Sequence, residues 1–337
     1  MEPRLVRFEG FENLHLVGDV WGDDNAWPVL LMHGGGQTRH AWGGTARTLA
    51  EHGWRAVSMD LRGHGDSEWA LNGDYSFTAF AGDCVAVCDA LGRPPVLVGA
   101  SLGGVAAMIA EGGSDREVSS GLVVVDITHR STPEGIQRIH DFMSSGLGGF
   151  ATLEEAAEAI GAYTPNRTKR VNPAGLMKVL RQKPDGRWYW HWDPKFIDRG
   201  RTEVPQEDFQ GLFEAALANI RVPTLLVRGL LSDVVTDEGI QDFLTKIPGS
   251  KLADVGDASH MVAGDQNDAF STAVVDFLEH DVRPVISGRP SSVVGSLRVA
   301  APSSAGDPHQ QQEAPSWDCW TRPRMQQRSS VTRPKRV

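Results

Sequence analysis

The stretch Val96-Leu97-Val98-Gly99-Ala100-Ser101-Leu102-Gly103-Gly104 decides the fold of this chain. Its first three residues form an apolar run typical of a buried strand, and the residues after it, 105–110, have a helical pattern. Gly99 and Gly103 flank Ser101 in the pattern G-x-S-x-G, where small neighbours permit a tight turn that exposes the central hydroxyl. A strand before the turn and a helix after it predict that Ser101 is a nucleophile.

Apolar runs and helical stretches alternate on both sides of this turn. The runs are short, rich in Val and Leu, and mostly non-alternating, which indicates strands buried on both faces of a parallel sheet. Two alternating runs, Leu5–Phe8 and Leu14–Val20, indicate an antiparallel pair at the sheet edge. The predicted fold class is therefore α/β, a doubly wound, mostly parallel sheet with its site at the carboxyl ends of the strands. Further strands are predicted at Val29–Met32, Arg55–Met59, Val96–Gly99, Leu122–Val125, Thr224–Val227 and Lys251–Asp254, and helices at Trp42–His52, Phe77–Leu91, Leu102–Gly112, Thr236–Ile247 and Asp268–His280.

The interval between Asp126 and Thr224 breaks this rhythm. It contains helical patterns and no strand of comparable strength, so we expect an inserted helical cap at residues 129–220 and a core made of residues 1–128 and 221–281. Residues 282–337 are rich in Pro, Ser, Gln and Arg and carry nine Arg or Lys against three Asp or Glu. This composition predicts a disordered basic tail, either a bare appendage or a partner-binding arm. The cap helices are predicted at Pro133–Ser144, Leu153–Tyr163, Pro173–Leu180 and Glu207–Asn219.

Composition and charge exclude several classes of partner. The formal net charge of −10 argues against nucleic acid, because phosphate binding needs a basic surface. The cysteines, three in number, are too sparse for a disulfide framework and too few at one place for a zinc site. No stretch has the length of a membrane helix and the N-terminus lacks the apolar run of a signal peptide, so we expect a cytoplasmic protein that acts on a small molecule.

Two backbone N–H groups are predicted to stabilise the negative charge that acyl transfer builds on a carbonyl oxygen. One belongs to Leu102, the residue after the nucleophile. The other lies in the loop His33-Gly34-Gly35-Gly36, which follows a predicted strand; Gly35 is the predicted donor and Gly36 the alternative. His33 is expected to orient this loop by hydrogen bonds.

A serine hydroxyl needs a base, and the base needs a carboxylate. Among the histidines, which number eleven, His260 is predicted to be the base, because it lies between the last strand and the final helix. Asp233, in the loop after Thr224–Val227, is the predicted acid, and Asp126 is the rival. His64 is expected to be structural, whereas His40, His129 and His191 are candidates for the mouth of a pocket.

These motifs resemble the α/β-hydrolase superfamily, in its lidded branch. The resemblance lies in HGGG at 33–36, DLRGHGDS at 60–67, GASLGG at 99–104, RGLLSD at 228–233 and ASHM at 258–261. It implies a Ser–His–Asp triad and no cofactor or metal. Epoxide hydrolases and haloalkane dehalogenases look similar but place Asp at the nucleophile position, so Ser101 argues against both.

The predicted cap holds Trp188-Tyr189-Trp190-His191-Trp192, with three of the ten tryptophans of the chain. Trp188, Trp190 and Trp192 are candidate pocket-lining residues, although such rings equally form the packing core of a cap. Phe142, Met143 and Phe150 are weaker candidates of the same kind. We expect hydrolysis of a small to medium, apolar carboxylic ester; the alternatives are a carbon–carbon bond hydrolase, a lactonase, or a ligand-binding protein without turnover.

Overall fold

The computed structural model describes residues 1–163, 173–201, 206–256 and 267–288, and all structural statements below concern these residues. Its main feature is an eight-stranded sheet in the order β1-β2-β4-β3-β5-β6-β9-β10. The β1–β2 and β2–β4 pairs are antiparallel, and all other neighbours are parallel. The fold class and the antiparallel edge predicted from the sequence are thereby confirmed. The strands are β1 Arg4–Glu9, β2 His15–Trp21, β3 Pro28–Met32, β4 Arg55–Met59, β5 Val96–Ala100, β6 Gly121–Val125, β9 Thr224–Gly229 and β10 Lys251–Val255.

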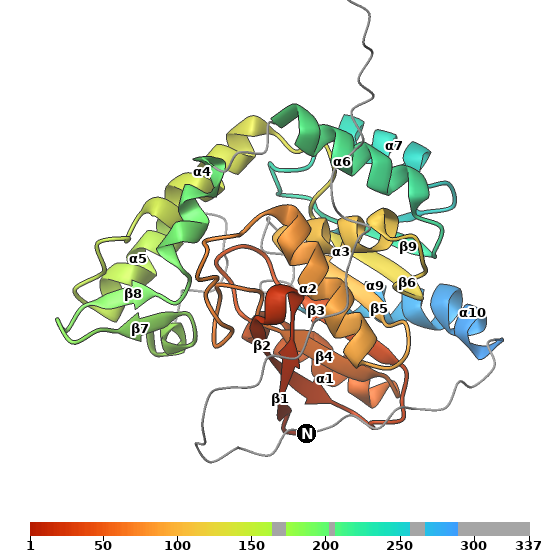
Figure 1. Ribbon diagram of the computed structural model, residues 1–337, viewed down its shortest axis with the longest axis horizontal. Coiled ribbons are helices and arrows are strands. Elements are labelled where there is room, and N and C mark those ends of the chain that lie inside the picture. Colours follow the sequence, from red (N-terminus) through yellow and green to blue (C-terminus); the bar gives the residue numbers. More distant parts are fainter. Residues whose placement is uncertain (164–172, 202–205, 257–266, 289–337) are drawn as a thin grey trace, which may run out of the picture. The chain divides into compact units, whose positions relative to one another are not determined.

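The central strands bury both faces, as their continuous apolar sequences predict. In β3, Leu30 and Met32 belong to one hydrophobic cluster and Val29 and Leu31 to another, because successive side chains point to opposite faces. Helices cover each face: α2 and α3 pack together on one, and α1 and α9 pack together on the other (Figure 1). The sheet is therefore doubly wound. The helices of this part of the chain are α1 Gly43–Glu51, α2 Phe77–Ala90, α3 Leu102–Gly113, α7 Asp237–Lys246 and α9 Asn267–Phe277.

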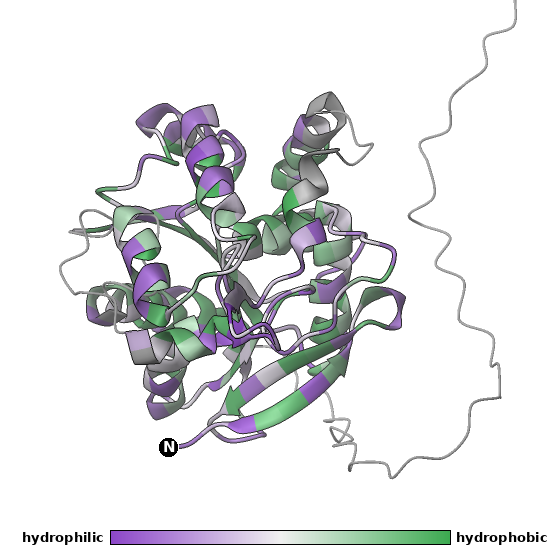
Figure 2. Ribbon diagram, turned by 90° about the vertical axis from the view of Figure 1, so that its left-hand side faces the viewer, coloured by the Kyte–Doolittle hydropathy of each residue, from purple (hydrophilic) through white to green (hydrophobic). Residues whose placement is uncertain are grey.

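Side-chain caps begin several helices where the sequence predicts their starts. The Ser76 hydroxyl accepts from the Ala79 N–H at the start of α2, and Thr132 and Thr236 cap α4 (Pro133–Ser144) and α7 in the same way. The helices mix hydrophilic and hydrophobic residues along their length, as amphipathic helices do (Figure 2).

The segment predicted as a helical cap is not wholly helical. Residues 180–190 form a separate two-stranded antiparallel hairpin, β7 Leu180–Gln182 and β8 Trp188–Trp190. Its turn contains Pro184-Asp185-Gly186, and Gly186 has a φ of 82°, a left-handed conformation that favours glycine. The helices of the segment are α4 Pro133–Ser144, α5 Leu153–Tyr163 and α6 Gln206–Asn219, with 3₁₀ turns at Pro173–Lys178 and Pro194–Arg201.

The predicted tail boundary at residue 282 is wrong by a few residues. A π-helical turn, Leu278–Val282, continues into α10, Arg283–Ser287. Val282 and Ile286 are buried in the hydrophobic cluster on the α9 side of the sheet. These two apolar residues are four apart, so they lie on one buried face of a short helix, whereas Val285 between them is exposed. The rest of the predicted tail, 289–337, lies outside the described residues.

Candidate active site

Ser101 lies in a strained turn between β5 and α3, as the G-x-S-x-G pattern predicts. Its φ of 46° and ψ of −112° are unfavourable for a residue with a β-carbon. The flanking glycines make this turn possible: a β-carbon at Gly99 would lie 2.3 Å from the Gly103 carbonyl oxygen. One at Gly103 would lie 2.4 Å from the Met32 carbonyl oxygen, at the end of β3. Small residues therefore bring the start of α3 against the sheet.

The loop predicted to hold an oxyanion donor, residues 33–37, is named the oxyanion loop below and runs beside Ser101. A β-carbon built on Gly34 would be 3.4 Å from the Ser101 Cβ. The Gly34 carbonyl oxygen accepts hydrogen bonds from the His33 Nδ1–H (2.8 Å) and from the Gln37 N–H (3.1 Å). Because the C=O and N–H of a trans peptide point in opposite directions, these bonds turn the Gly35 N–H away from His33.

Two N–H groups of this region have no protein acceptor among the described residues. The Gly35 N–H donates to none of them, whereas the Gly36 N–H donates to His64 Nε2 (3.2 Å). The Leu102 N–H is the first of α3, so it has no partner within the helix. Of the two donors considered in the HGGG loop, the Gly35 N–H is the one left open.

Asp126 is buried at the carboxyl end of β6, next to the strand that carries Ser101. The Ser101 N–H donates to the carbonyl oxygen of Val125, the residue before Asp126 (3.0 Å). The Asp126 side chain accepts from the Gly229 N–H (3.0 Å) and from the Ser232 hydroxyl (2.5 Å). The residue is 1% exposed.

Asp233 has a different environment. Its side chain is 41% exposed and forms an ion pair with Arg138 of α4, while its carbonyl oxygen accepts from the Thr132 hydroxyl (2.6 Å). Both carboxylates act on Tyr163, at the end of α5. Burial, together with the charges of Asp233 and Asp126, raises the pKa of its phenol to about 12. The carboxylate of Asp233 is therefore paired with α4, whereas that of Asp126 is enclosed at the end of the sheet.

His260, the predicted base, lies outside the described residues. The histidines around the oxyanion loop are already engaged. His33 Nε2 accepts from the Leu61 N–H (3.0 Å), and the His64 Nδ1–H donates to the Arg62 carbonyl oxygen (2.9 Å). Burial lowers the pKa of His33 to about 4, so this ring is neutral at pH 7. The hydrogen bonds of His33 agree with the expected orienting role, and both ring nitrogens of His64 form hydrogen bonds with the backbone.

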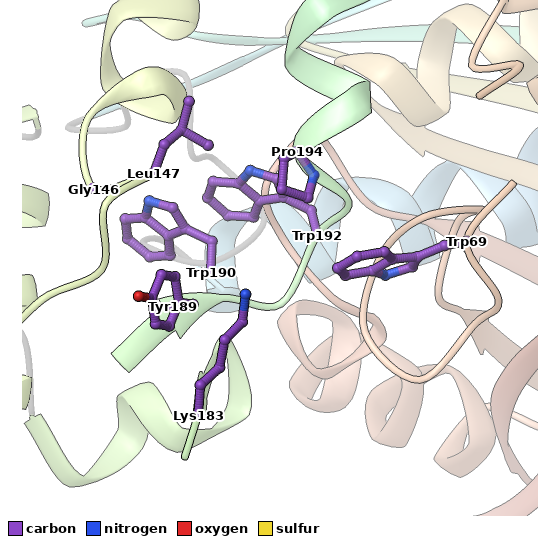
Figure 3. A pocket seen from close by; sticks show the side chains of 8 residues that line it. All are labelled: Trp69, Gly146, Leu147, Lys183, Tyr189, Trp190, Trp192 and Pro194. Carbon is purple, nitrogen blue, oxygen red and sulfur yellow. The ribbon is translucent and has the colours of Figure 1, made fainter. Parts of the chain in front are cut away.

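Aromatic side chains of the predicted cap lie over the oxyanion loop. A β-carbon at Gly36 would lie 3.2 Å from the Trp192 ring and 3.3 Å from the Met143 side chain. Trp190 stacks on Trp192 with 4.6 Å between ring centroids, and the two rings lie side by side in Figure 3. Phe142 and Phe150 pack edge-on against Trp190. Of the three predicted tryptophans, Trp192 reaches the loop, Trp190 supports it and Trp188 is half-buried on the hairpin.

Phe196 and His191 were not predicted to contact the loop. The Phe196 ring lies 3.7 Å from where a Gly35 β-carbon would be, and no sequence motif marks it. His191, expected near a pocket mouth, is instead 3% exposed and packs 5.7 Å from the His64 ring. The Trp190 and Trp192 rings also help to form a pocket, which is lined by Trp69, Gly146, Leu147, Lys183, Tyr189, Trp190, Trp192 and Pro194 (Figure 3).

One group of described side chains has the composition of a metal site. His129, Glu214 and Asp242 bring one ligand atom each within 4.8 Å of one another. The two carboxylates, however, are already neutralised by cations: Arg130 Nε lies 2.9 Å from Asp242, and Lys246 Nζ lies 2.5 Å from Glu214. A metal ion would have to displace both, so this group reads as a link between α6 and α7. His129 is buried in it and does not reach the oxyanion loop.

A strained serine between a parallel strand and a helix, with a glycine loop beside it, defines the α/β-hydrolase class of protein. The comparisons with known proteins agree: the family described as "Alpha/beta hydrolase family" matches residues 29–273, and the chain belongs to this family. Esterase Rv0045c of Mycobacterium tuberculosis is 30% identical over 228 residues, which cover 65% of this chain and 70% of that protein. A 3-hydroxybutyrate-oligomer hydrolase of Cupriavidus necator is 28% identical over 71% of this chain and 85% of its own length.

Solved structures show the same fold. An α/β hydrolase from Novosphingobium aromaticivorans superposes with a TM-score of 0.69 at 24% identity, covering 82% of this chain and 98% of its own. The structure of the Mycobacterium tuberculosis esterase Rv0045c has a TM-score of 0.66 at 26% identity, covering 83% and 93%. Among the described residues, no helix is both long and apolar enough to span a membrane.

Proposed function

We propose that this protein is a serine esterase that cleaves a small to medium, apolar carboxylic ester through an acyl-enzyme. The observation that carries the proposal is the pair of open N–H groups, Gly35 and Leu102, flanking a strained serine. Donors that wait unpaired for a developing oxyanion stabilise the transition state without reorganising. The names of two relatives, an esterase and an oligomer hydrolase, support ester hydrolysis.

The reaction follows from these groups. The Ser101 hydroxyl attacks the ester carbonyl carbon while His260 takes its proton, and the carbonyl oxygen becomes an oxyanion held by the Gly35 and Leu102 N–H groups. Collapse expels the alcohol, which receives the proton from His260. Water then attacks the acyl-enzyme by the same route and releases the carboxylic acid.

For the acid of the triad we propose Asp126 in place of Asp233. Chain order alone favours Asp233, but its carboxylate is partly exposed and paired with Arg138. Asp126 is enclosed and held by two donors, which leaves a carboxylate of fixed orientation beside the nucleophile strand. A buried, oriented carboxylate is what an imidazole base needs to keep its tautomer.

The residues above the loop support an apolar acyl group. Met143, Trp192 and Phe196 all approach Gly35 or Gly36, and none of them is charged. These side chains are already almost fully buried, so the gain comes from the ligand: an apolar acyl group packed against them removes its own surface from water, which favours binding by about 25 cal/mol per Å².

The test is turnover of a short-to-long p-nitrophenyl ester series by wild type, Ser101→Ala and an exposed control, Ser287→Ala. Labelling with a fluorophosphonate probe runs in parallel. We expect wild type and Ser287→Ala to turn over and label, and Ser101→Ala to do neither. Labelling without ester turnover would favour the carbon–carbon hydrolase or lactonase alternative. Absence of both from the wild type would overturn the proposed function.

A further inference from the structure

His191 is a cap residue that lies inside the hydrogen bonding of the core. It follows β8 directly, yet its Nδ1 accepts from the N–H of Gly65 in the core (2.6 Å). Since Nδ1 is an acceptor, the ring proton is on Nε2, and Nε2 faces the Gly36 carbonyl oxygen at 3.4 Å. Burial, and then the neighbouring His64 and His33, lower the pKa of His191 well below its usual value, so the ring stays neutral at pH 7.

Three histidines fix three successive peptides of the oxyanion loop. His33 binds the C=O of Gly34, and this peptide carries the Gly35 N–H. His64 binds the Gly36 N–H, which fixes the next peptide. His191 faces the Gly36 C=O and so fixes the third. Gly36 has a φ of 75°. Glycines can adopt many other backbone conformations, so these hydrogen bonds are needed to hold the loop in this one.

The cap residues around His191 are themselves fixed to the core. The Tyr75 hydroxyl donates to Asp193 Oδ2 (2.6 Å), and the Asp193 N–H donates to the Gly63 carbonyl oxygen (2.9 Å). Arg181, on β7, pairs with Asp66 (3.0 Å). His191 is thus held on both sides, and its ring cannot leave Gly36 without breaking buried hydrogen bonds.

We propose that His191 is a positioning residue of the oxyanion hole, through which the cap holds the glycine loop in the shape that presents the Gly35 N–H. The proposal rests on the proposed function and extends it: the cap would take part in transition-state stabilisation as well as in covering the substrate. The hydrogen bond from Nε2 to Gly36 is the contact that matters for catalysis, whereas the bond from Gly65 to Nδ1 anchors the ring.

Two substitutions separate these contacts. In His191→Gln the amide nitrogen can reach the position of Nε2 and donate to Gly36. In His191→Asn the shorter amide reaches only the position of Nδ1 and can accept from Gly65. With His191→Ala, we expect kcat to fall about 10- to 100-fold with little change in KM, because a misplaced oxyanion donor acts on the transition state. His191→Gln should recover most of this loss and His191→Asn little of it.

Affinity for a trifluoromethyl ketone supplies the second readout, because Ser101 adds to this inhibitor and forms an oxyanion. We expect its inhibition constant to rise as kcat falls, so that it is higher for the Ala and Asn variants than for the Gln variant. The control His280→Gln, at an exposed histidine in the turn Leu278–Val282, should match wild type in kcat and in inhibition constant. Tyr75→Phe removes one cap anchor while the Asp193 N–H bond to Gly63 remains, so it should lower the unfolding midpoint and cost much less kcat than His191→Ala.

Three results would overturn the proposal. Equal kcat for the Gln and Asn variants would mean that the His191 ring only fills space. An inhibition constant that does not rise as kcat falls would mean the same. Loss of kcat in Tyr75→Phe as large as in His191→Ala would assign the effect to cap stability. Wild type that neither labels at Ser101 nor cleaves esters would instead remove the proposed function, and the inference with it.

Discussion

Asp126 adopts a φ of 51° at the end of β6, in the left-handed region that a residue with a β-carbon avoids unless its surroundings hold it there. The holding contacts are the Gly229 N–H and the Ser232 hydroxyl, which come from the end of β9 and the loop after it. A buried carboxylate without such donors would be costly. The strain and the donors together fix the orientation of this side chain, as the proposed triad acid requires.

Exchanging each carboxylate for an amide tests this assignment. We expect Asp126→Asn to lower kcat about 10³-fold or more, because an amide can hold the imidazole in the wrong tautomer. Asp233→Asn should change kcat by less than about threefold, because it loses only a partly exposed ion pair with Arg138. Steady-state turnover of the best p-nitrophenyl ester measures both, with thermal unfolding as a check that each variant is folded. The reverse ranking would return the role to Asp233.

The residues of the site differ in how far the sequence can predict them. Ser101, Leu102 and Gly35 follow from short local patterns, because a turn and a helix start are built by neighbours in the chain. The choice between Asp126 and Asp233 depends on which partners surround each carboxylate, and these partners come from distant segments. His191 depends on the docking of the cap, which no local pattern in WYWHW specifies.

At the scale of elements, the core was predictable because each central strand is a continuous apolar run between turns. β4, Arg55–Met59, has the predicted bounds, and α4 and α5 do as well. The hairpin β7–β8 was missed because strands of three residues carry too little pattern to distinguish from a loop. The turn signal Pro184-Asp185-Gly186 was present in the sequence, and the run of three aromatic residues Trp188–Trp190 would have supported a strand beside it.

The packing of α3 against β3 makes a prediction at the same scale. In Gly103→Ala the added methyl group would meet the Met32 backbone, which cannot move without shifting β3. We expect the variant to lose about 3 kcal/mol or more of unfolding free energy, together with activity. Gly161→Ala is the matched control: it lies in α5 with no atom within 4 Å of the new carbon, so helix propensity should stabilise it by about 0.5 kcal/mol or more. Urea unfolding measures both, and equal stabilities would contradict the close packing.

At the scale of the whole molecule, buried neutral histidines make stability depend on pH. The pKa of His33 is lowered from the usual 6.5 to about 4 by burial, and the pKa values of His191, His129 and His40 are also lowered, each mainly by burial. Between pH 4 and pH 6.5 the histidines of the unfolded chain bind protons that those of the folded chain do not. The free energy of unfolding is therefore highest above pH 6.5 and falls as the pH falls toward 4.

We therefore expect the free energy of unfolding to fall between pH 7 and pH 4.5. His33 alone can account for a loss of up to about 3 kcal/mol, at 1.36 kcal/mol per pKa unit. Urea titrations at several pH values measure the slope. His191→Gln removes one of these groups and should show a shallower slope than wild type. Stability that is flat over this range would mean that these rings are protonated in the folded protein.

The last described helix, α10, and the turn before it contribute to stability through two buried side chains. Val282 packs against the start of β6, where a β-carbon on Gly121 would lie 2.8 Å from its Cγ2, and Ile286 joins the same cluster. Ending the chain after Asp281 removes both side chains from the core, at about 1.5–3 kcal/mol each. We expect that truncation to lower the unfolding free energy by several kcal/mol. Ending the chain after Gly288 should leave stability and ester turnover unchanged if residues 289–337 are a bare appendage. Unchanged turnover combined with loss of a binding partner would identify them as a partner-binding arm, and lost turnover would show that they belong to the catalytic protein.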